Sequence, residues 1–356
     1  MTYFKIIIGA VLLITATSEW IRTDEKVVEN HDFVLRLRLK AKDPYALDNA
    51  LRSVSYPESS RYRQYLSKEE IEELVRPEVD LQYAKNIIST KFPDSVISSS
   101  LHNEYVVVSN VTTKDISRVF PEIELSVYRH SRLKNRTIIR SSDPTQTSIP
   151  SELKSFVTTI SGLSEKFPIP LERKKNIGSD PGIKVTPPVI WKQYNMTDKD
   201  IGGKSSTSQG VAAFEDAEFK QQDVMAFQTA YNIPEVKFQV IGPNDGGYFG
   251  EAGLDTQYIS ASGRGVPSWF LSHEQFDMLA FCELVLNMTD IPKVVSISWG
   301  SGESEYDRDH MSQASECFQK MGLSGITVLS ASGDQGTGKQ GGLFSCKKFD
   351  PTWPAS

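Results

Sequence analysis

Cysteine is scarce in this sequence: there are three in 356 residues, and no two form a C-x-x-C pair. The five histidines are scattered along the chain. Zinc ligands of the usual spacing are therefore missing, and we predict no metal site within the chain. Basic blocks are missing as well, because 39 lysines and arginines are dispersed among 45 acidic residues, for a net charge of -6. We therefore predict no nucleic-acid partner.

A long apolar run is also lacking. The run from Ile6 to Ile14 is about half of the length that spans a bilayer. It follows Lys5 and precedes the small residues Ala16 and Ser18, as in a cleaved secretory signal. We predict a signal peptide over residues 1–18 and a soluble mature protein with no membrane partner, and a membrane anchor is the less favoured alternative.

The sequence also contains glycosylation signals and cysteines, which concern chemistry of the secretory pathway. Asn-x-Ser/Thr sequons occur at Asn110, Asn135, Asn195 and Asn287, which predicts a glycoprotein of the secretory pathway. The odd number of cysteines leaves at least one thiol without an internal partner. Cys282 and Cys317 lie on two predicted helices and are candidates for a disulfide, with unpaired thiols as the alternative; Cys346 lies near the end of the sequence.

Residues 19–167 have the pattern of a small α+β domain. Residues 33–40, 104–110 and 123–130 are expected to be strands, because they are rich in β-branched residues or alternate apolar and polar side chains. Helices are expected after the N-cap candidates Ser67 and Asp80, and from Val111 to the residue before Pro121. This order predicts a ferredoxin-like sandwich, with one sheet covered by two helices.

A segment rich in proline and glycine follows at residues 168–186 and predicts an exposed processing linker. Residues 187–356 then alternate short β-branched strands, at 210–215, 236–242 and in the segments beginning KVVSISWG and GITVLSASGD, with helices, one of them expected over 272–287. Such repeats predict a doubly wound parallel sheet with helices on both faces and sites at the carboxyl ends of the strands.

Two carboxylates stand out on the helix after the second of these strands. Glu251 and Asp255 are four residues apart, which places them on one helical face. Carboxylates that close disfavour double ionisation, so that one can serve as a general base while the other orients it. The same spacing is common on solvated helices, and only the glycine-rich approach through Gly250 and the position after a strand favour a site here.

A third acid, Asp334, ends the apolar segment ITVLSASGD in a glycine-lined turn. A protonated carboxyl group there can donate a hydrogen bond to an oxyanion, a contribution on the order of 3 kcal/mol. The alternative is an aspartate that caps its own turn. Trp299 and Gly300 end the predicted strand VVSISWG, where the glycine would let a peptide lie against the backbone and the indole would wall a pocket. A core tryptophan is the simpler interpretation.

Taken together, E-x-x-x-D, the SWG segment and S-G-D, in this order, resemble the sedolisins, a family of serine-carboxyl peptidases. TPPVIWKQYN at 186–195 resembles the family's mature amino-terminus, and YRQYLSKEEIEELVRP at 62–77 resembles its activation prodomain. The resemblance implies a subtilisin-like domain, incomplete here, that releases tripeptides from peptide substrates in acid, as lysosomal members do. The prodomain would act as an intramolecular inhibitor that covers the cleft until acid loosens it.

In this resemblance Glu251 is the general base, Asp255 its partner and Asp334 the oxyanion donor. The family's nucleophile motif, S-G-T-S, does not occur in the 356 residues, and the Ca²⁺ site of the family belongs to the same missing carboxyl-terminal part. We therefore expect an inactive precursor, truncated before its nucleophile. A secreted binding or decoy protein made of the prodomain and part of a peptidase domain is the alternative.

Overall fold

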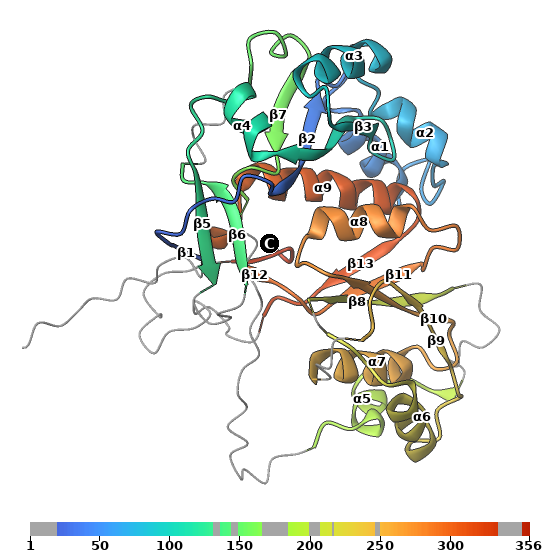
Figure 1. The fold of residues 1–356 in the computed structure, drawn as a ribbon. Coiled ribbons are helices and arrows are strands. Elements are labelled where there is room, and N and C mark those ends of the chain that lie inside the picture. The colour runs from blue at the N-terminus through green and yellow to red at the C-terminus, as the bar shows by residue number, and fades with distance from the viewer. Residues whose placement is uncertain are drawn as a thin grey trace, which may run out of the picture.

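The computed structural model describes residues 20–130, 136–143, 149–165, 184–198, 207–215, 217–245, 250–333 and 351–356. They form two domains, one on each side of the predicted linker (Figure 1). That linker, residues 168–186, lies almost wholly outside the described residues, so its boundaries stay a prediction.

The N-terminal domain is built on β2, Asp32–Leu39, whose alternation buries Phe33, Leu35, Leu37 and Leu39 on one face. Its sheet also contains β3 (Val96–Ser99), β4 (Tyr105–Thr112) and β7 (Val157–Ser161), in the antiparallel order β3-β4-β2-β7. The helices α3, Leu81–Lys91, and α4, Thr113–Val119, complete a β-α-β-β-α-β arrangement. This is the predicted ferredoxin-like topology.

The helices of this domain begin where the sequence provides caps. Ser67 forms a reciprocal capping box with Glu70 at the start of α2, Lys68–Leu74. Asp80 accepts a hydrogen bond from the backbone of Tyr83 at the start of α3. These side chains satisfy backbone N–H groups that have no partner within the helix, and both predicted N-caps are confirmed. The sequence analysis did not predict α1, Ala46–Ser55.

Residues 123–130 were predicted to be a strand, which is confirmed as β5, Leu125–His130, but they do not join the main sheet. They form a second sheet, β1-β5-β6, with β1 at Trp20–Arg22 and β6 at Thr137–Ser141. The expectation of one sheet was therefore wrong. A short connection favours pairing between consecutive strands, and β5 pairs antiparallel with β6 for this reason.

The second domain is a five-stranded parallel sheet of order β13-β11-β8-β10-β9. Its strands are β8 (Gln209–Phe214), β9 (Phe238–Ile241), β10 (Ser268–His273), β11 (Val294–Ile297) and β13 (Thr327–Ser330). Every residue of the central strand β8 is buried, as expected for a parallel sheet covered on both faces.

Helices cover the two faces of this sheet in two groups (Figure 1). One group contains α5 (Pro187–Gln193), α6 (Gln221–Ala230) and α7 (Gly250–Ser262), and the other contains α8 (Met278–Leu286) and α9 (Arg308–Leu323). The predicted doubly wound class is confirmed. A short antiparallel pair joins β12, Ser301–Gly302, to β14, Thr352–Trp353, and a 3-10 turn follows β12 at Glu303–Glu305.

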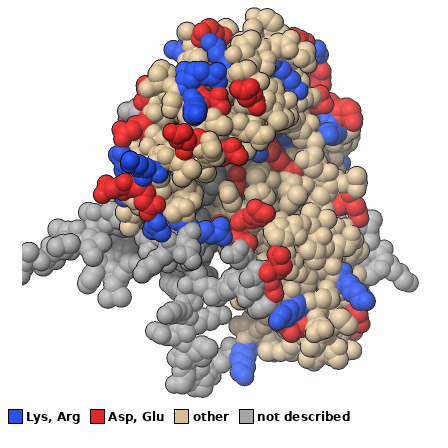
Figure 2. Space-filling view, viewed as in Figure 1, with Lys and Arg blue, Asp and Glu red and all other residues tan. Residues whose placement is uncertain are grey.

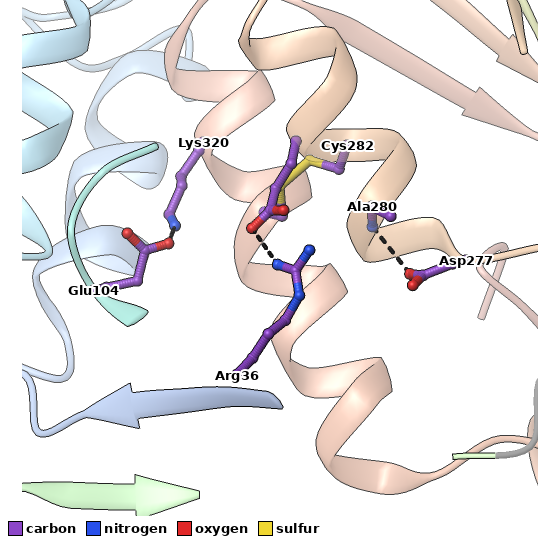
Figure 3. Close-up of a disulfide and its surroundings, with 8 residues drawn as sticks. Arg36, Glu104, Asp277, Ala280, Cys282 and Lys320 are labelled. Carbon is purple, nitrogen blue, oxygen red and sulfur yellow. Dashed lines mark hydrogen bonds and ion pairs between the residues drawn. A yellow bond between two sulfur atoms is a disulfide. The ribbon is translucent and has the colours of Figure 1, made fainter. Parts of the chain in front are cut away.

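The helix expected over residues 272–287 was wrong in its first turns. Residues 268–273 form β10, which lies between β8 and β9, and α8 begins only at Met278. The Asp277 carboxylate caps α8 by accepting a hydrogen bond from the Ala280 backbone at 2.9 Å (Figure 3). An apolar run does not distinguish a buried strand from a buried helix by periodicity, and this cap sets the boundary.

The open face of the N-terminal sheet rests on α8 and α9 (Figure 1). The polar side of β2 points at these helices: Arg36 pairs with Glu283 of α8 and Arg38 with Glu316 of α9, both at 2.6 Å. A disulfide between Cys282 and Cys317 links α8 to α9, which settles the alternative left open by the sequence (Figure 3). These two interdomain ion pairs therefore lie on one helical layer of the second domain. Among the described residues, no helix is long and apolar enough to span a bilayer.

Candidate active site

The predicted carboxylate pair lies in the first half of α7, on the side that faces β11. Asp255 Oδ1 accepts a hydrogen bond of 2.8 Å from Ser298 Oγ, and Ser298 directly follows the last residue of β11. Asp255 Oδ2 is buried and has no hydrogen-bond partner, and Glu251, one helical turn earlier, is close enough to act on the Asp255 pKa through its charge. The i, i+4 spacing therefore brings the two acids together, at the carboxyl edge of the sheet where sites are expected.

The environment of Asp255 favours its protonated form. Burial raises the pKa of Asp255 to about 7, the negative charge of Glu251 adds to the rise, and the hydrogen bond from Ser298 opposes it. Asp255 thus keeps its proton to a pH far above the ordinary range of an aspartic acid. This is the arrangement in which one acid can accept a proton while the other positions it.

Replacing Asp255 by Asn should flatten the pH dependence of the free energy of unfolding. The folded-state pKa of Asp255, about 7, exceeds the ordinary value of 3.8. Protonated Asp255 therefore contributes fully to the free energy of unfolding below pH 3.8, and this contribution is lost as the pH rises through 7. A shift of this size corresponds to about 4 kcal/mol. Denaturant titrations at pH 4, 5.5 and 7.5 measure it. Asp223→Asn, at an exposed site on α6, is the control, and equal slopes for Asp255→Asn and wild type would contradict the raised pKa.

The third predicted acid, Asp334, lies outside the described residues. The strand that leads to it, β13, pairs in parallel with β11, so that Ser330 lies beside Ile297. The described residues that follow β13 and β11 therefore leave the sheet at the same edge. The role predicted for Asp334 stays a prediction.

Trp299 and Gly300 lie beyond the end of β11, which stops at Ile297. Trp299 is 6% exposed, and its ring packs edge-on against Phe214 with the centroids 5.8 Å apart. A Cβ atom on Gly300 would come within 2.9 Å of the Trp353 carbonyl oxygen. The indole thus contributes to the core, and the chain's own β14 segment approaches the glycine as closely as a bound peptide would. Their role in substrate binding stays a prediction.

Two residues at this edge of the sheet were not predicted from the sequence. Ser298 gave no pattern of its own, since a serine after a strand is common. Glu215 follows β8 directly and has a left-handed backbone with φ of 58°; its carboxylate accepts a hydrogen bond from the Phe276 backbone and pairs with Arg136 of the N-terminal domain at 3.1 Å. The rule that sites gather at the carboxyl ends of parallel strands would have selected it. The N-terminal domain thus reaches the carboxyl end of β8, at the same edge of the sheet as Ser298.

Other predicted features fall partly within the described residues. Asn110, Asn195 and Asn287 are exposed and so accessible to glycan, whereas Asn135 and Cys346 lie outside the described residues. Within the described ranges, no group of three or more metal-ligating side chains gathers to hold an ion. On the face shown in Figure 2, acidic and basic side chains alternate without a large patch of one sign.

Comparison with known proteins adds three findings. Residues 20–166 match the pro-kumamolisin activation domain. Tripeptidyl-peptidase 1 of Mus musculus is 28% identical over 351 residues, covering 93% of this chain and 61% of the relative, and that of Homo sapiens is 27% identical over 339 residues, covering 90% and 59%. A solved Pseudomonas sedolisin (serine-carboxyl proteinase), in complex with pseudo-iodotyrostatin, is 22% identical, with a TM-score of 0.39 over 48% of this chain and 50% of that one.

The part of the chain that matches an activation domain is thus the ferredoxin-like domain, which packs against the helices of the doubly wound domain. Over most of its length the chain is similar to tripeptidyl-peptidase 1, and its N-terminal domain is similar to the activation domain of pro-kumamolisin. It spans about 60% of the length of the curated relatives that it matches.

Proposed function

We propose that this chain is part of the precursor of an acid-acting serine-carboxyl peptidase that releases tripeptides from the amino-termini of polypeptides. The observation that carries the proposal is the half-buried pair Glu251 and Asp255 at the carboxyl edge of the sheet, where Ser298 donates a hydrogen bond to Asp255. The similarity to tripeptidyl-peptidase 1 over most of the chain supports the choice of substrate. The match to an activation domain supports the precursor state.

In the proposed reaction, a serine hydroxyl attacks the carbonyl carbon of the third residue of the substrate. Glu251 takes the hydroxyl proton as the new O–C bond forms, and Asp255 orients Glu251. Asp334 in its protonated form donates a hydrogen bond to the oxyanion. When the C–N bond breaks, Glu251 returns the proton to the leaving amine, and water then hydrolyses the acyl-enzyme. Trp299 and Gly300 would contact the substrate.

Carboxyl groups suit this chemistry in an acidic compartment. A histidine with an ordinary pKa near 6.5 is mostly protonated there and cannot act as a base. We therefore propose a lysosomal or extracellular site of action, reached by the secretory route, with glycans on the predicted sequons. The Ca²⁺ implied by the resemblance would bind outside the described residues, and no step above uses it.

The docked N-terminal domain would hold the precursor inactive. It contacts α8 and α9 through Arg36 and Arg38, and its Arg136 reaches Glu215 at the carboxyl end of β8. An arginine at this edge places a positive charge and a bulky side chain where a peptide would have to enter. The proposed inhibition therefore works by occupation of the site from within the same chain.

The experiment that tests the proposal is to sequence the transcript past the codon for Ser356 and express the whole reading frame. A serine in an S-G-T-S motif, followed by release of tripeptides from a peptide with a free amino-terminus at pH 4 to 5, supports the peptidase; mass spectrometry identifies the products. A stop codon directly after Ser356, with no product in this assay, would instead support a secreted binding or decoy protein, a possibility that the missing motif keeps open.

A further inference from the structure

Residues 184–198, which we call the α5 segment, lie against α7, the helix that carries Glu251 and Asp255 (Figure 1). The hydrogen bonds between the segment and this helix are made at its carboxyl-terminal half, whereas the acids are in its first half. None of the side chains in these hydrogen bonds takes part in the proposed cleavage of peptides. Their effect on the acids is therefore indirect.

Trp191, near the end of α5, is bonded to the last turn of α7. Its indole Nε1–H donates a hydrogen bond of 2.8 Å to the Ala261 carbonyl oxygen. Carbonyl groups in the last turn of a helix have no donor within the helix, so they need a partner from elsewhere. Almost one turn earlier, the Tyr258 hydroxyl donates a hydrogen bond of 2.7 Å to the Val185 carbonyl oxygen. The α5 segment is thus bonded to α7 at two successive turns.

Arg264, two residues past the end of α7, joins the same contact. It is only 5% exposed, and its guanidinium carbon lies 4.8 Å from the centroid of the Trp191 ring. Its Nη2 donates a hydrogen bond to the Thr197 carbonyl oxygen, and its Nη1 lies 3.5 Å from the Asp198 carboxylate. A cation is favourable both against an indole face and at the carboxyl end of a helix. A buried charge without partners is costly, so the α5 segment cannot leave α7 without a large loss at Arg264.

Gln209, the first residue of β8, holds the same end of α7 from the sheet. Its Nε2 donates hydrogen bonds to the carbonyl oxygens of Ile259 and Gly263, at 3.2 and 3.3 Å. A Cβ atom on Gly263 would come within 2.0 Å of Gln209 Oε1, so this close approach requires a glycine. The carboxyl-terminal end of α7 is therefore fixed by both β8 and the α5 segment.

A helix carries a displacement of one end to the other. Asp255 is six residues before Ala261, about 9 Å along the axis. A slip of α7 by one residue would move the Asp255 carboxylate by about 1.5 Å and turn it by about 100°, which would break its 2.8 Å hydrogen bond with Ser298. A misplacement of about 1 Å can lower a rate by about 100-fold. The contacts at the far end of α7 therefore bear on where the two acids lie.

We infer that Trp191 and Arg264 are positioning residues. With the rest of the α5 segment they form a clasp on α7, and this clasp holds the two acids of that helix against Ser298. The inference rests on the proposed function and deepens it, because it makes the first described residues after the linker a part of the active peptidase. A cut ahead of residue 184 leaves the clasp intact, so the mature peptidase would keep it.

Steady-state kinetics on the whole reading frame test the inference. Trp191→Leu removes both the hydrogen bond to Ala261 and the ring against Arg264. The value of kcat for tripeptide release at pH 4 to 5 should therefore fall by about 10- to 100-fold, while KM changes less than about twofold. Tyr194→Leu is the matched control, because Tyr194 is an aromatic residue of the same segment but is 74% exposed; it should keep the wild-type kcat. A normal kcat in folded Trp191→Leu would overturn the inference.

A double-mutant cycle with Ser298→Ala distinguishes positioning from a general loss of stability. If the clasp acts through the acids, Trp191→Leu/Ser298→Ala should have a kcat close to that of the slower single variant, since both changes loosen the same pair. Losses that multiply would overturn the positioning role. Trp191→Phe keeps a ring against Arg264 and should lie between wild type and Trp191→Leu. If Trp191→Leu does not fold, a wild-type kcat in Trp191→Phe overturns the inference.

Hydrogen exchange on the 356-residue chain separates failure of the clasp from failure of the proposed function. The Gly263 amide donates a hydrogen bond of 2.8 Å to the Ile259 carbonyl oxygen at the end of α7. It should exchange on the order of 10-fold faster in Trp191→Leu than in wild type, while the amides of β10 keep their protection. If wild type releases no tripeptide, the proposed function fails, and faster exchange at Gly263 still supports the clasp. Equal exchange overturns the clasp whatever the kinetics show.

Discussion

Replacing Lys320 by Met should lower the free energy of unfolding at pH 7 by about 3–5 kcal/mol, since it leaves the Glu104 carboxylate buried without its counter-charge. Glu104 would then bind a proton to avoid a buried, unpaired charge. Urea denaturation at pH 7 measures the loss.

The double variant Glu104→Leu/Lys320→Met distinguishes the loss of the whole ion pair from the cost of leaving one buried charge without its partner. An apolar pair of similar size leaves no buried charge, so most of the stability should return. Arg52→Met is the control, because its partner Asp48 is exposed and a surface pair of this kind contributes less than about 1 kcal/mol. A Lys320→Met chain as stable as the Arg52→Met chain would mean that the buried pair does not hold the domains.

Replacing Glu251 by Gln in the whole reading frame should lower kcat for tripeptide release by about 10²- to 10⁴-fold. Under the proposed function, Gln keeps the shape of the side chain but cannot accept the proton of the serine hydroxyl. The substrate contacts are unchanged, so KM should change little. Steady-state kinetics at pH 4 to 5 measure both constants.

The partner acid provides a further check. If Glu251 and Asp255 act as a unit, the variant with both replaced should be little worse than Glu251→Gln alone. Glu235→Gln is the control, since this residue is exposed in the connection before β9, at the opposite edge of the sheet. Normal turnover by Glu251→Gln would remove the general base from the mechanism.

Local rules predicted much of this fold. The alternation in β2 and the capping side chains Ser67 and Asp80 depend on residues within a few positions of one another, and the structure has them as expected. The order of strands and helices sufficed for the ferredoxin-like and doubly wound classes. Cooperation between local preference and the global fold explains why these predictions hold.

The predictions that failed depended on contacts between segments that are far apart in the chain. The last two residues of β10 were assigned to a helix and its first four to no element, since only the place of β10 between β8 and β9 makes this apolar segment a strand. The same limit applies to the site. Spacing alone brought Glu251 and Asp255 together, but Ser298 is 43 residues from Asp255 and Arg136 is far from Glu215 in the chain. No pattern in a single segment contains such contacts.

The disulfide between Cys282 and Cys317 has a consequence for the docking of the N-terminal domain. Each cysteine is the neighbour of an acid that receives an arginine: Cys282 precedes Glu283, and Cys317 follows Glu316. The bond holds its two Cα atoms 6.0 Å apart, close to the roughly 7 Å between alternate residues of a strand such as Arg36 and Arg38. Formation of the disulfide thus sets Glu283 and Glu316 at a spacing that matches Arg36 and Arg38. In a thiol-reducing compartment the disulfide would not form, and this spacing would not be fixed.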